Sequence, residues 1–174
     1  MIADIRLAQT PAELSALFAF RYRIYVEEMG RTQKYADHTT RNISDPLDAA
    51  AFNLVAWHDE RIVGCVRVNF ARDGGLDYYR DLLRMEAIGP SWPDRVSLCT
   101  RLMIAPRWRR TTLAVRLSIA CYELGLGSGI AWNFIDCNDH LVGFFERLGY
   151  EFTHQPTHEE YGQVNAMRFD LYAI

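Results

Sequence analysis

Two arginines stand in apolar sequence, where an unpaired charge would be strongly destabilising. Arg67 lies in "RIVGCVRVNF" and Arg101 lies in "SLCTRLMIA". Each guanidinium therefore needs either an acidic side chain or an anionic ligand. A guanidinium can hold a carboxylate or a phosphate through two parallel hydrogen bonds, so these arginines could bind the carboxylate of a small molecule. A structural ion-pair network with acidic side chains is the alternative, and both roles can coexist.

The elements that carry these residues alternate between strands and helices. A helix is predicted to begin after a capping box formed by Thr10 and Glu13 and to end near Gly30. Strands are predicted at 5–7, 52–57, 61–70, 95–105, 130–136 and 165–172, and the second and third of them form an antiparallel hairpin. Further helices are predicted at 76–85, 111–129 and 140–149, and a loop at 32–45. This order predicts an α/β (α+β) fold with one domain over residues 1–174.

The strand predicted at 95–105 has two different faces. Alternate residues of a strand point to opposite sides of the sheet. One face is apolar, and the other carries Ser97, Cys99, Arg101 and Met103. The second face could line a cleft.

Composition limits the classes of protein to which the chain can belong. Its 174 residues are 49% hydrophobic and 24% charged, as in ordinary globular proteins. The net charge of -3 disfavours nucleic acid as a partner, and no apolar run is long enough to span a membrane. The four cysteines form no CxxC pair, so we expect no metal site, and we expect a reduced, cytoplasmic protein with cysteines in its core. The histidines lie in or near predicted loops, where we expect surface or turn positions.

The second half of the chain resembles the GNAT acyltransferase superfamily. In that family a strand and a helix are joined by a loop of pattern R/Q-x-x-G-x-G/A, and "RRTTLA" stands in the same register. Free N–H groups at a helix N-terminus can bind a phosphate, and nearby arginines add positive charge. The resemblance implies a donor site made of Met103, Ile104, Arg109, Arg110, Thr111, Thr112, Leu113 and Ala114. Thr112 departs from the family's glycine, and an ordinary threonine-capped helix is the alternative.

A second motif of the superfamily, N-x-x-A-x-x-x-Y-x-x-x-G-F, matches "NDHLVGFFERLGYEF". Phe145 stands where many members have a tyrosine that protonates the leaving thiolate, and phenylalanine cannot donate a proton. The superfamily resemblance implies a mixed, mostly antiparallel central sheet flanked by helices. It also implies that backbone N–H groups of residues 102–104 hold the oxyanion.

The first half is similar to the branch of acyl-homoserine-lactone synthases and N-acyl amino acid synthases. The branch has R-x-x-x-F/Y, D-x-x-D and two strand arginines, which correspond here to Arg21, Tyr25, Asp45, Asp48, Arg67 and Arg101. Homoserine-lactone synthases also carry a glutamate three residues before the last arginine, where this chain has Leu98. This difference argues against S-adenosylmethionine as the amine donor and favours the N-acyl amino acid synthases.

Acyl transfer to an amine requires positioning of the two substrates and removal of a proton. The candidates for proton removal are Asp48, Glu28 and Asp45, whose alternative role is to cap turns or to face solvent. The candidates for substrate binding are Arg21, Tyr25, Met29, Arg67 and Arg101. Met29 ends an apolar helix face that could line a pocket for a medium or long acyl chain.

The sequence therefore predicts an N-acyltransferase. The acyl donor would be acyl-coenzyme A or the phosphopantetheine of an acyl carrier protein, and the acceptor would be the amine of a small molecule such as an amino acid. Two alternatives remain: a short-chain acetyl-coenzyme A acetyltransferase, and a catalytically silent module that binds thioesters.

Overall fold

The structure is a computed structural model that describes residues 2–173, apart from the side chain of Asp77. Its residues group into two compact units. The first unit contains the chain up to Val68 together with Arg101–Cys121. The second unit contains Asn69–Thr100 and the chain from Tyr122 onward. One domain over residues 1–174 stays a prediction.

The first unit is built on the strand order β1-β4-β5-β6. These strands are β1 (Asp4–Leu7), β4 (Ala51–His58), β5 (Arg61–Phe70) and the end of β6 (Val96–Ile104). β1 is antiparallel to β4, with Asp4 opposite Trp57. Asp59 and Glu60 join β4 to β5, and both have a positive φ, as in the two-residue turns that match strand twist. The predicted hairpin is thereby confirmed.

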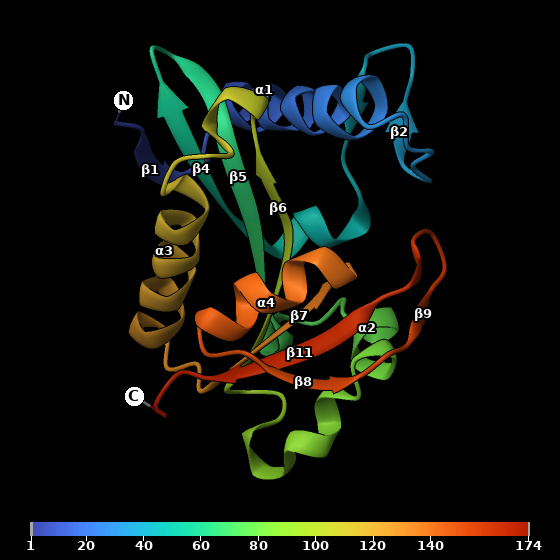
Figure 1. Cartoon of the computed structure of the whole chain (residues 1–174), viewed down its shortest axis with the longest axis vertical. Helices are drawn as coiled ribbons and strands as arrows, with labels where there is room; N and C mark the ends of the chain where they lie inside the picture. Colours follow the sequence, from blue (N-terminus) through green and yellow to red (C-terminus); the bar gives the residue numbers. More distant parts are fainter. Residues whose placement is uncertain (1, 174) are drawn as a thin grey trace. The chain divides into compact units, whose positions relative to one another are not determined.

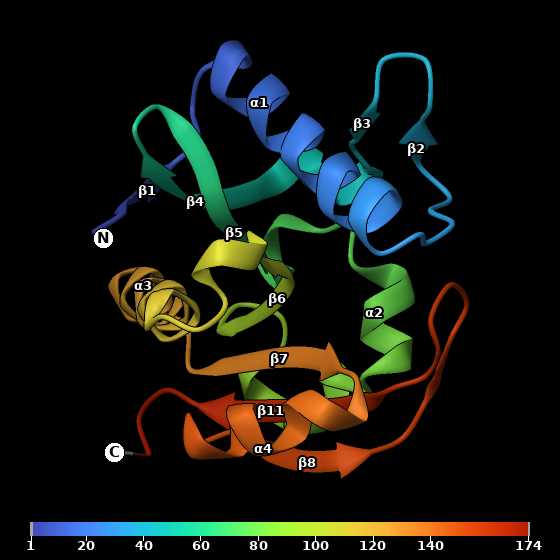
Figure 2. The same cartoon turned by 45° about the horizontal axis from the view of Figure 1, so that its top comes forward.

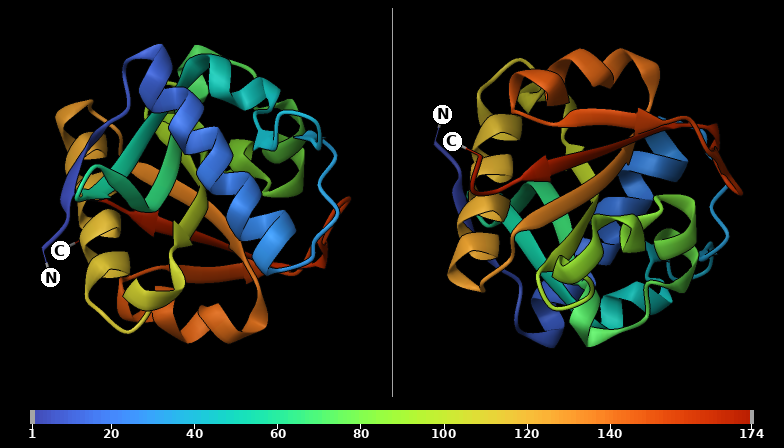
Figure 3. Two further views of the ribbon diagram at one scale, coloured as in Figure 1. Left: turned by 90° about the horizontal axis from the view of Figure 1, so that it is seen from above. Right: turned by 90° about the horizontal axis from the view of Figure 1, so that it is seen from below.

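Helix α1 (Pro11–Tyr22) packs on this sheet, as Figure 3 shows. Its predicted capping box is present, with Thr10 and Glu13 as partners. The core between the helical segment and the sheet contains Leu17, Phe20, Ile24, Val55, Ile62, Cys65 and Met103. The chain continues as a π-helix, η1 (Arg23–Glu28), and Gly30 follows with φ 62°. The predicted end near Gly30 is correct, and the π-helix was not predicted.

Shorter elements complete the first unit. Residues 32–45, predicted as a loop, contain an antiparallel hairpin of β2 (Ala36–Asp37) and β3 (Asn42–Ile43). Figure 2 shows this hairpin beside the C-terminal part of α1. Two 3-10 helices, η2 (Pro46–Ala50) and η5 (Pro106–Trp108), precede β4 and α3 (Leu113–Gly127).

The second unit has the strand order β6-β7-β11-β8. β7 (Trp132–Cys137) is parallel to the start of β6, and β11 (Asn165–Asp170) is antiparallel to both β7 and β8 (Glu151–His154). Figure 1 shows α4 (Asp139–Arg147) over β7, β11 and β8. The other elements are η3 (Ala71–Asp73), α2 (Asp77–Leu82), η4 (Met85–Ser91), β9 (Thr157–His158) and β10 (Gly162–Gln163). The predicted α/β fold with a mixed, mostly antiparallel sheet flanked by helices is confirmed.

Two expectations about single residues are wrong. His158 was expected at the surface or in a turn, yet it is buried in β9, where its ring stacks on Tyr161 with centroids 4.5 Å apart. Met103 was expected on a cleft-lining face, yet its side chain is buried under α1.

Arg101 has φ 61°, a left-handed conformation that is uncommon within a strand and is typical of a β-bulge. No helix that the structure describes between residues 2 and 173 is long and apolar enough to cross a membrane.

Candidate functional site

The first unit contains a buried cluster of three arginines and two aspartates. The Asp45 carboxylate accepts hydrogen bonds from Arg67 Nη1 at 2.6 Å and from Arg101 Nη2 at 2.8 Å. Asp48 accepts two bonds from Arg21 Nη1, at 2.8 and 2.9 Å, and lies 3.3 Å from Arg67 Nη1. The strand arginines therefore have the acidic partners that the sequence required.

The spacing of the two aspartates serves a local structure as well. Asp45 is the N-cap of η2, and its Oδ1 accepts a bond from the Leu47 amide at 3.0 Å. Asp48 closes the capping box, because its Oδ2 accepts the Asp45 amide at 2.9 Å. Pro46 occupies the first turn, where its missing N–H costs nothing. The turn and the ion pairs hold both carboxylates in fixed orientations.

Neutral side chains complete the cluster. Arg21 Nη2 donates to Asn53 Oδ1 at 2.7 Å, and Arg101 Nη1 donates to Gln33 Oε1 at 2.9 Å. The Arg101 guanidinium also lies 5.2 Å from the centre of the Tyr25 ring, a cation–π contact. Sequence reasoning missed Asn53 and Gln33, because no local pattern marks an amide as the partner of a distant arginine.

The described arginine and aspartate side chains of this cluster carry three positive and two negative charges, so one positive charge is in excess among them. Burial raises the pKa of the Asp45 carboxyl, but the charges of Arg67 and Arg101 outweigh burial and hold it below its usual value. The side chains of Arg21 and Arg67 are each 1% exposed, and that of Arg101 is 8% exposed. Of the three arginines, Arg101 is the one nearest to solvent.

Cys65 lies beside this cluster and donates its thiol proton to the Arg101 carbonyl at 3.5 Å. Burial raises the pKa of this thiol to about 11, although Arg21 and Arg101 act in the opposite direction. A buried thiol with such a pKa stays protonated at neutral pH and is a poor nucleophile. Cys65, Cys99 and Cys137 are buried and form no disulfide, as the sequence predicted, and Cys121 is half-buried.

The turn between η5 and α3 offers backbone amides to a ligand. The Thr111 amide donates to the Trp108 carbonyl at 3.1 Å, and the Leu113 amide donates to Thr111 Oγ1 at 3.2 Å. Within the part of the chain that the structure describes, the amides of residues 110, 112, 114 and 115 have no hydrogen-bond partner. Thr111 thus stabilises the turn through its amide and its hydroxyl group, while the amides of residues 110, 112, 114 and 115 can donate hydrogen bonds to an anion.

Arg109 connects this turn to η1. Its Nε donates to the carbonyl of Ile104, the last residue of β6, at 3.0 Å, and its Nη2 lies 2.5 Å from Glu28 Oε1. Glu28 therefore pairs with a different arginine from those that hold Asp45 and Asp48. Met29 follows directly, with 45% of its surface exposed.

The second unit holds a polar network that the sequence did not predict. Tyr150 donates to Asn133 Oδ1 at 2.5 Å, and Asn133 Nδ2 donates to Ser97 Oγ at 2.8 Å and to Cys99 Sγ at 3.1 Å. Ser97 and Asn133 face each other where β6 and β7 pair. Phe145 is buried against Tyr150, with ring centroids 5.4 Å apart, as expected for core packing.

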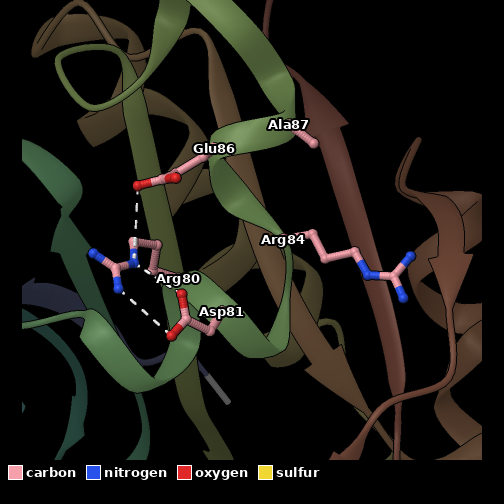
Figure 4. A pocket seen from close by; sticks show the side chains of 5 residues that line it. All are labelled: Arg80, Asp81, Arg84, Glu86 and Ala87. Carbon is pink, nitrogen blue, oxygen red and sulfur yellow. Dashed lines mark hydrogen bonds and ion pairs between the residues drawn. The ribbon is translucent and has the colours of Figure 1, made fainter.

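A surface hollow of about 320 Å³ also lies in the second unit (Figure 4). Arg80 in its wall pairs with Asp81 at 2.9 Å and with Glu86 at 3.9 Å, and Arg84 points away from them. None of its lining residues belongs to the predicted site. In residues 2–173, no three His, Cys, Asp or Glu side chains are grouped so that they could hold a metal ion.

Comparisons with known proteins agree with the predicted resemblance. A family model described as an acetyltransferase (GNAT) domain matches residues 20–118, whereas no curated protein sequence matches. A coenzyme A-dependent acyl-homoserine lactone synthase, BjaI, solved with SAM and isopentyl-CoA, has a TM-score of 0.78 at 20% identity, over 98% of this chain and 84% of that chain. FeeM, an N-acyl amino acid synthase from uncultured soil microbes, has a TM-score of 0.75 at 15% identity, over 98% and 92% of the two chains. ElaA from Escherichia coli has a TM-score of 0.70 at 14% identity, over 97% and 100%.

Proposed function

Because the chain belongs to the acetyltransferase (GNAT) domain family, we propose that it is an N-acyltransferase that acylates the amine of an amino acid. Its family and its fold are those of acyl-transferring enzymes. The donor in this proposal is a thioester of phosphopantetheine, carried by coenzyme A or by an acyl carrier protein. BjaI, which shares the fold, was solved with isopentyl-CoA, and this supports coenzyme A as a donor.

The amide turn before α3 supports the donor half of the proposal. Four backbone N–H groups there have no partner in residues 2–173, and they lie at the positively polarised end of a 15-residue helix. Residues 101–121 contain five arginines and no acidic residue, so the surrounding charge also favours an anion. The donor's phosphate is therefore assigned to the turn that contains Arg110, Thr112 and Ala114.

The excess positive charge of the buried cluster is the observation that carries the acceptor half. An amino-acid carboxylate would balance this charge, and Arg101 is the arginine through which it can be reached. Gln33, the neutral partner of Arg101 Nη1, can give way to a carboxylate at a smaller cost than an aspartate can. Arg21 and Arg67, also predicted to bind substrate, would act by holding Asp48 and Asp45 in place.

In the reaction, the amine nitrogen attacks the thioester carbonyl, a C–N bond forms, the C–S bond breaks and the thiolate leaves. The amine must lose a proton, and a carboxylate or a water bound to one accepts it. The lowered pKa of Asp45 makes it a weak base, so the proposal keeps Asp48 as the acceptor, acting through water. Solvent returns a proton to the thiolate, since Phe145 has none to give.

The acceptor is tested by offering pairs of amines that differ by one group. Each amino acid is compared with the amine that lacks its carboxyl group, and products are measured by mass spectrometry. Arg101→Ala should lower kcat/KM for the amino acids about 30- to 4,000-fold, the range for truncating a buried charge pair. Arg101→Lys should recover little, because lysine cannot form the two parallel bonds. Equal acylation of both amines, or the same loss in the control Arg61→Ala, would contradict the proposal.

The donor is tested with coenzyme A thioesters and carrier-protein thioesters of the same acyl group. Thr112→Ile should raise the donor's KM while the melting temperature stays unchanged, because the larger side chain crowds the amide turn. Transfer restricted to acetyl groups would identify a short-chain acetyltransferase instead. Absence of free thiol with every donor and amine would identify a silent binding module.

A further inference from the structure

We propose that Glu28 limits the affinity of the enzyme for its donor by competing with the donor's phosphate for Arg109. This inference rests on the proposed function, because it assigns a specificity-determining role at the same donor site. Glu28 was predicted from sequence as a candidate for proton removal. The inference assigns it a different role.

The Glu28 carboxylate pairs with Arg109, an arginine that directly precedes the amide turn. Glu28 Oε1 is 2.5 Å from Arg109 Nη2, so the two side chains form a close ion pair. Arg109 Nε is held by the Ile104 carbonyl at 3.0 Å, so the guanidinium is anchored at both ends. The side chains of Glu28 and Arg109 are 29% and 45% exposed, so an incoming phosphate can reach the pair.

Around the turn itself, Glu28 pairs with one of the three arginines Arg107, Arg109 and Arg110. Arg107 and Arg110 form no ion pair within the described residues, and neither forms a side-chain hydrogen bond there. Arg116 donates to the Ala3 carbonyl at 2.8 Å. The Glu28 carboxylate therefore neutralises Arg109, whereas Arg107 and Arg110 have no acidic partner among the described residues.

Two consequences follow for a bound phosphate. It must share the guanidinium with a carboxylate, and it must tolerate a like charge roughly 7 Å away across that guanidinium. At a half-exposed surface, this repulsion corresponds to about a 3- to 30-fold loss of affinity. The penalty grows with the charge of the donor, so it weighs more on the pyrophosphate of coenzyme A than on a singly charged phosphodiester.

The test compares two donors that differ in their phosphates. kcat/KM is measured for an acyl-coenzyme A and for the same acyl group on pantetheine, which has no phosphate. The ratio of the two values cancels any effect of a substitution on the chemical step. Glu28→Gln should raise this ratio about 3- to 30-fold at low salt, and the gain should shrink in 0.5 M salt.

Glu27→Gln is the matched control. Glu27 precedes Glu28, carries the same charge and forms its ion pair with Arg41 on the β2–β3 turn. This substitution changes the net charge equally, yet it should leave the ratio unchanged. Arg109→Ala should lower the ratio, and adding Glu28→Gln to that variant should produce no further gain, because the residue for which Glu28 competes is gone.

The outcomes separate the inference from the proposed function. An unchanged ratio in Glu28→Gln overturns the inference, and so does an equal gain in Glu27→Gln or in the Arg109→Ala background. If Arg109→Ala and Thr112→Ile also leave the ratio unchanged, the phosphate site itself is wrong. If no thioester is turned over, the affinity for coenzyme A is measured by calorimetric titration instead of the ratio. Tighter binding of coenzyme A by Glu28→Gln than by the wild type supports the inference, and equal or weaker binding overturns it.

Discussion

Asp45→Asn should be among the most destabilising single substitutions in the first unit. Asp45 holds Arg67 at 2.6 Å and Arg101 at 2.8 Å, and the asparagine would leave three buried guanidinium groups with one carboxylate. Removing one partner of a buried ion pair costs about 3–5 kcal/mol, because the other charge stays buried without compensation. In a protein of this size each kcal/mol lowers the melting temperature by about 2–4 °C, so we expect a decrease of about 6–20 °C.

The assay measures the free energy of unfolding of the wild type and of Asp45→Asn in urea over a range of pH. Asp45 has a lower pKa in the folded protein than its usual value near 4, so its ionised form stabilises the fold above that value. The difference in stability between wild type and Asp45→Asn should therefore be constant from about pH 7 to pH 5. The difference in stability should become smaller as the pH falls through the pKa of Asp45 in the folded protein, because the wild-type carboxyl then becomes neutral.

Two further variants make this reasoning refutable. Asp59→Asn removes an exposed carboxylate in the β4–β5 turn and should change stability by less than about 0.5 kcal/mol. Arg101→Met, added to Asp45→Asn, restores the original charge balance of the cluster and should recover at least half of the loss. A cost below about 1 kcal/mol for Asp45→Asn, or a difference that is independent of pH, would refute the assignment of a tightly coupled network.

The remaining predictions concern a turn and the acyl chain. Gly149→Ala should lower the free energy of unfolding by about 2 kcal/mol, because Gly149 has φ 95° and a Cβ there would lie 2.8 Å from the ring of Phe169. The control is Gly127→Ala, where a Cβ would meet open space, and equal losses in the two variants would contradict the argument. With acyl donors of increasing length, kcat/KM should rise, by about a hundredfold for four added carbons if all are buried, and Met29→Trp should shorten the optimum. A flat series, or one that peaks at acetyl, would show that Met29 lines no pocket.

Features encoded in short stretches of sequence were predicted well. Thr10 and Glu13 identify the start of α1, and the turn before β5 identifies the hairpin, because each depends on residues a few positions apart. The need of Arg67 and Arg101 for acidic partners was equally predictable, since it follows from the cost of burying a charge. The choice of Asp45 and Asp48 came from the motif of the resembled family.

Features that depend on distant partners could not be predicted. Gln33 is 68 residues from Arg101, and Asn53 is 32 residues from Arg21, so neither pairing leaves a local signal. His158 lies in a polar segment, yet Tyr161 and two tyrosines from α2 bury its ring. The left-handed backbone at Arg101 could not be predicted either, because glycine is the residue that normally indicates a positive φ in a sequence.

That backbone conformation links the buried network to the surface. A positive φ at a residue with a long side chain costs free energy and persists where surrounding contacts compensate for it. Arg101 has such contacts, since its guanidinium binds Asp45 and Gln33 and lies against the ring of Tyr25. The same contacts leave it with the largest exposed fraction of the three cluster arginines. The proposed acceptor role gives this strained conformation a use, because a network that receives an anionic substrate needs one charge held at its most accessible point.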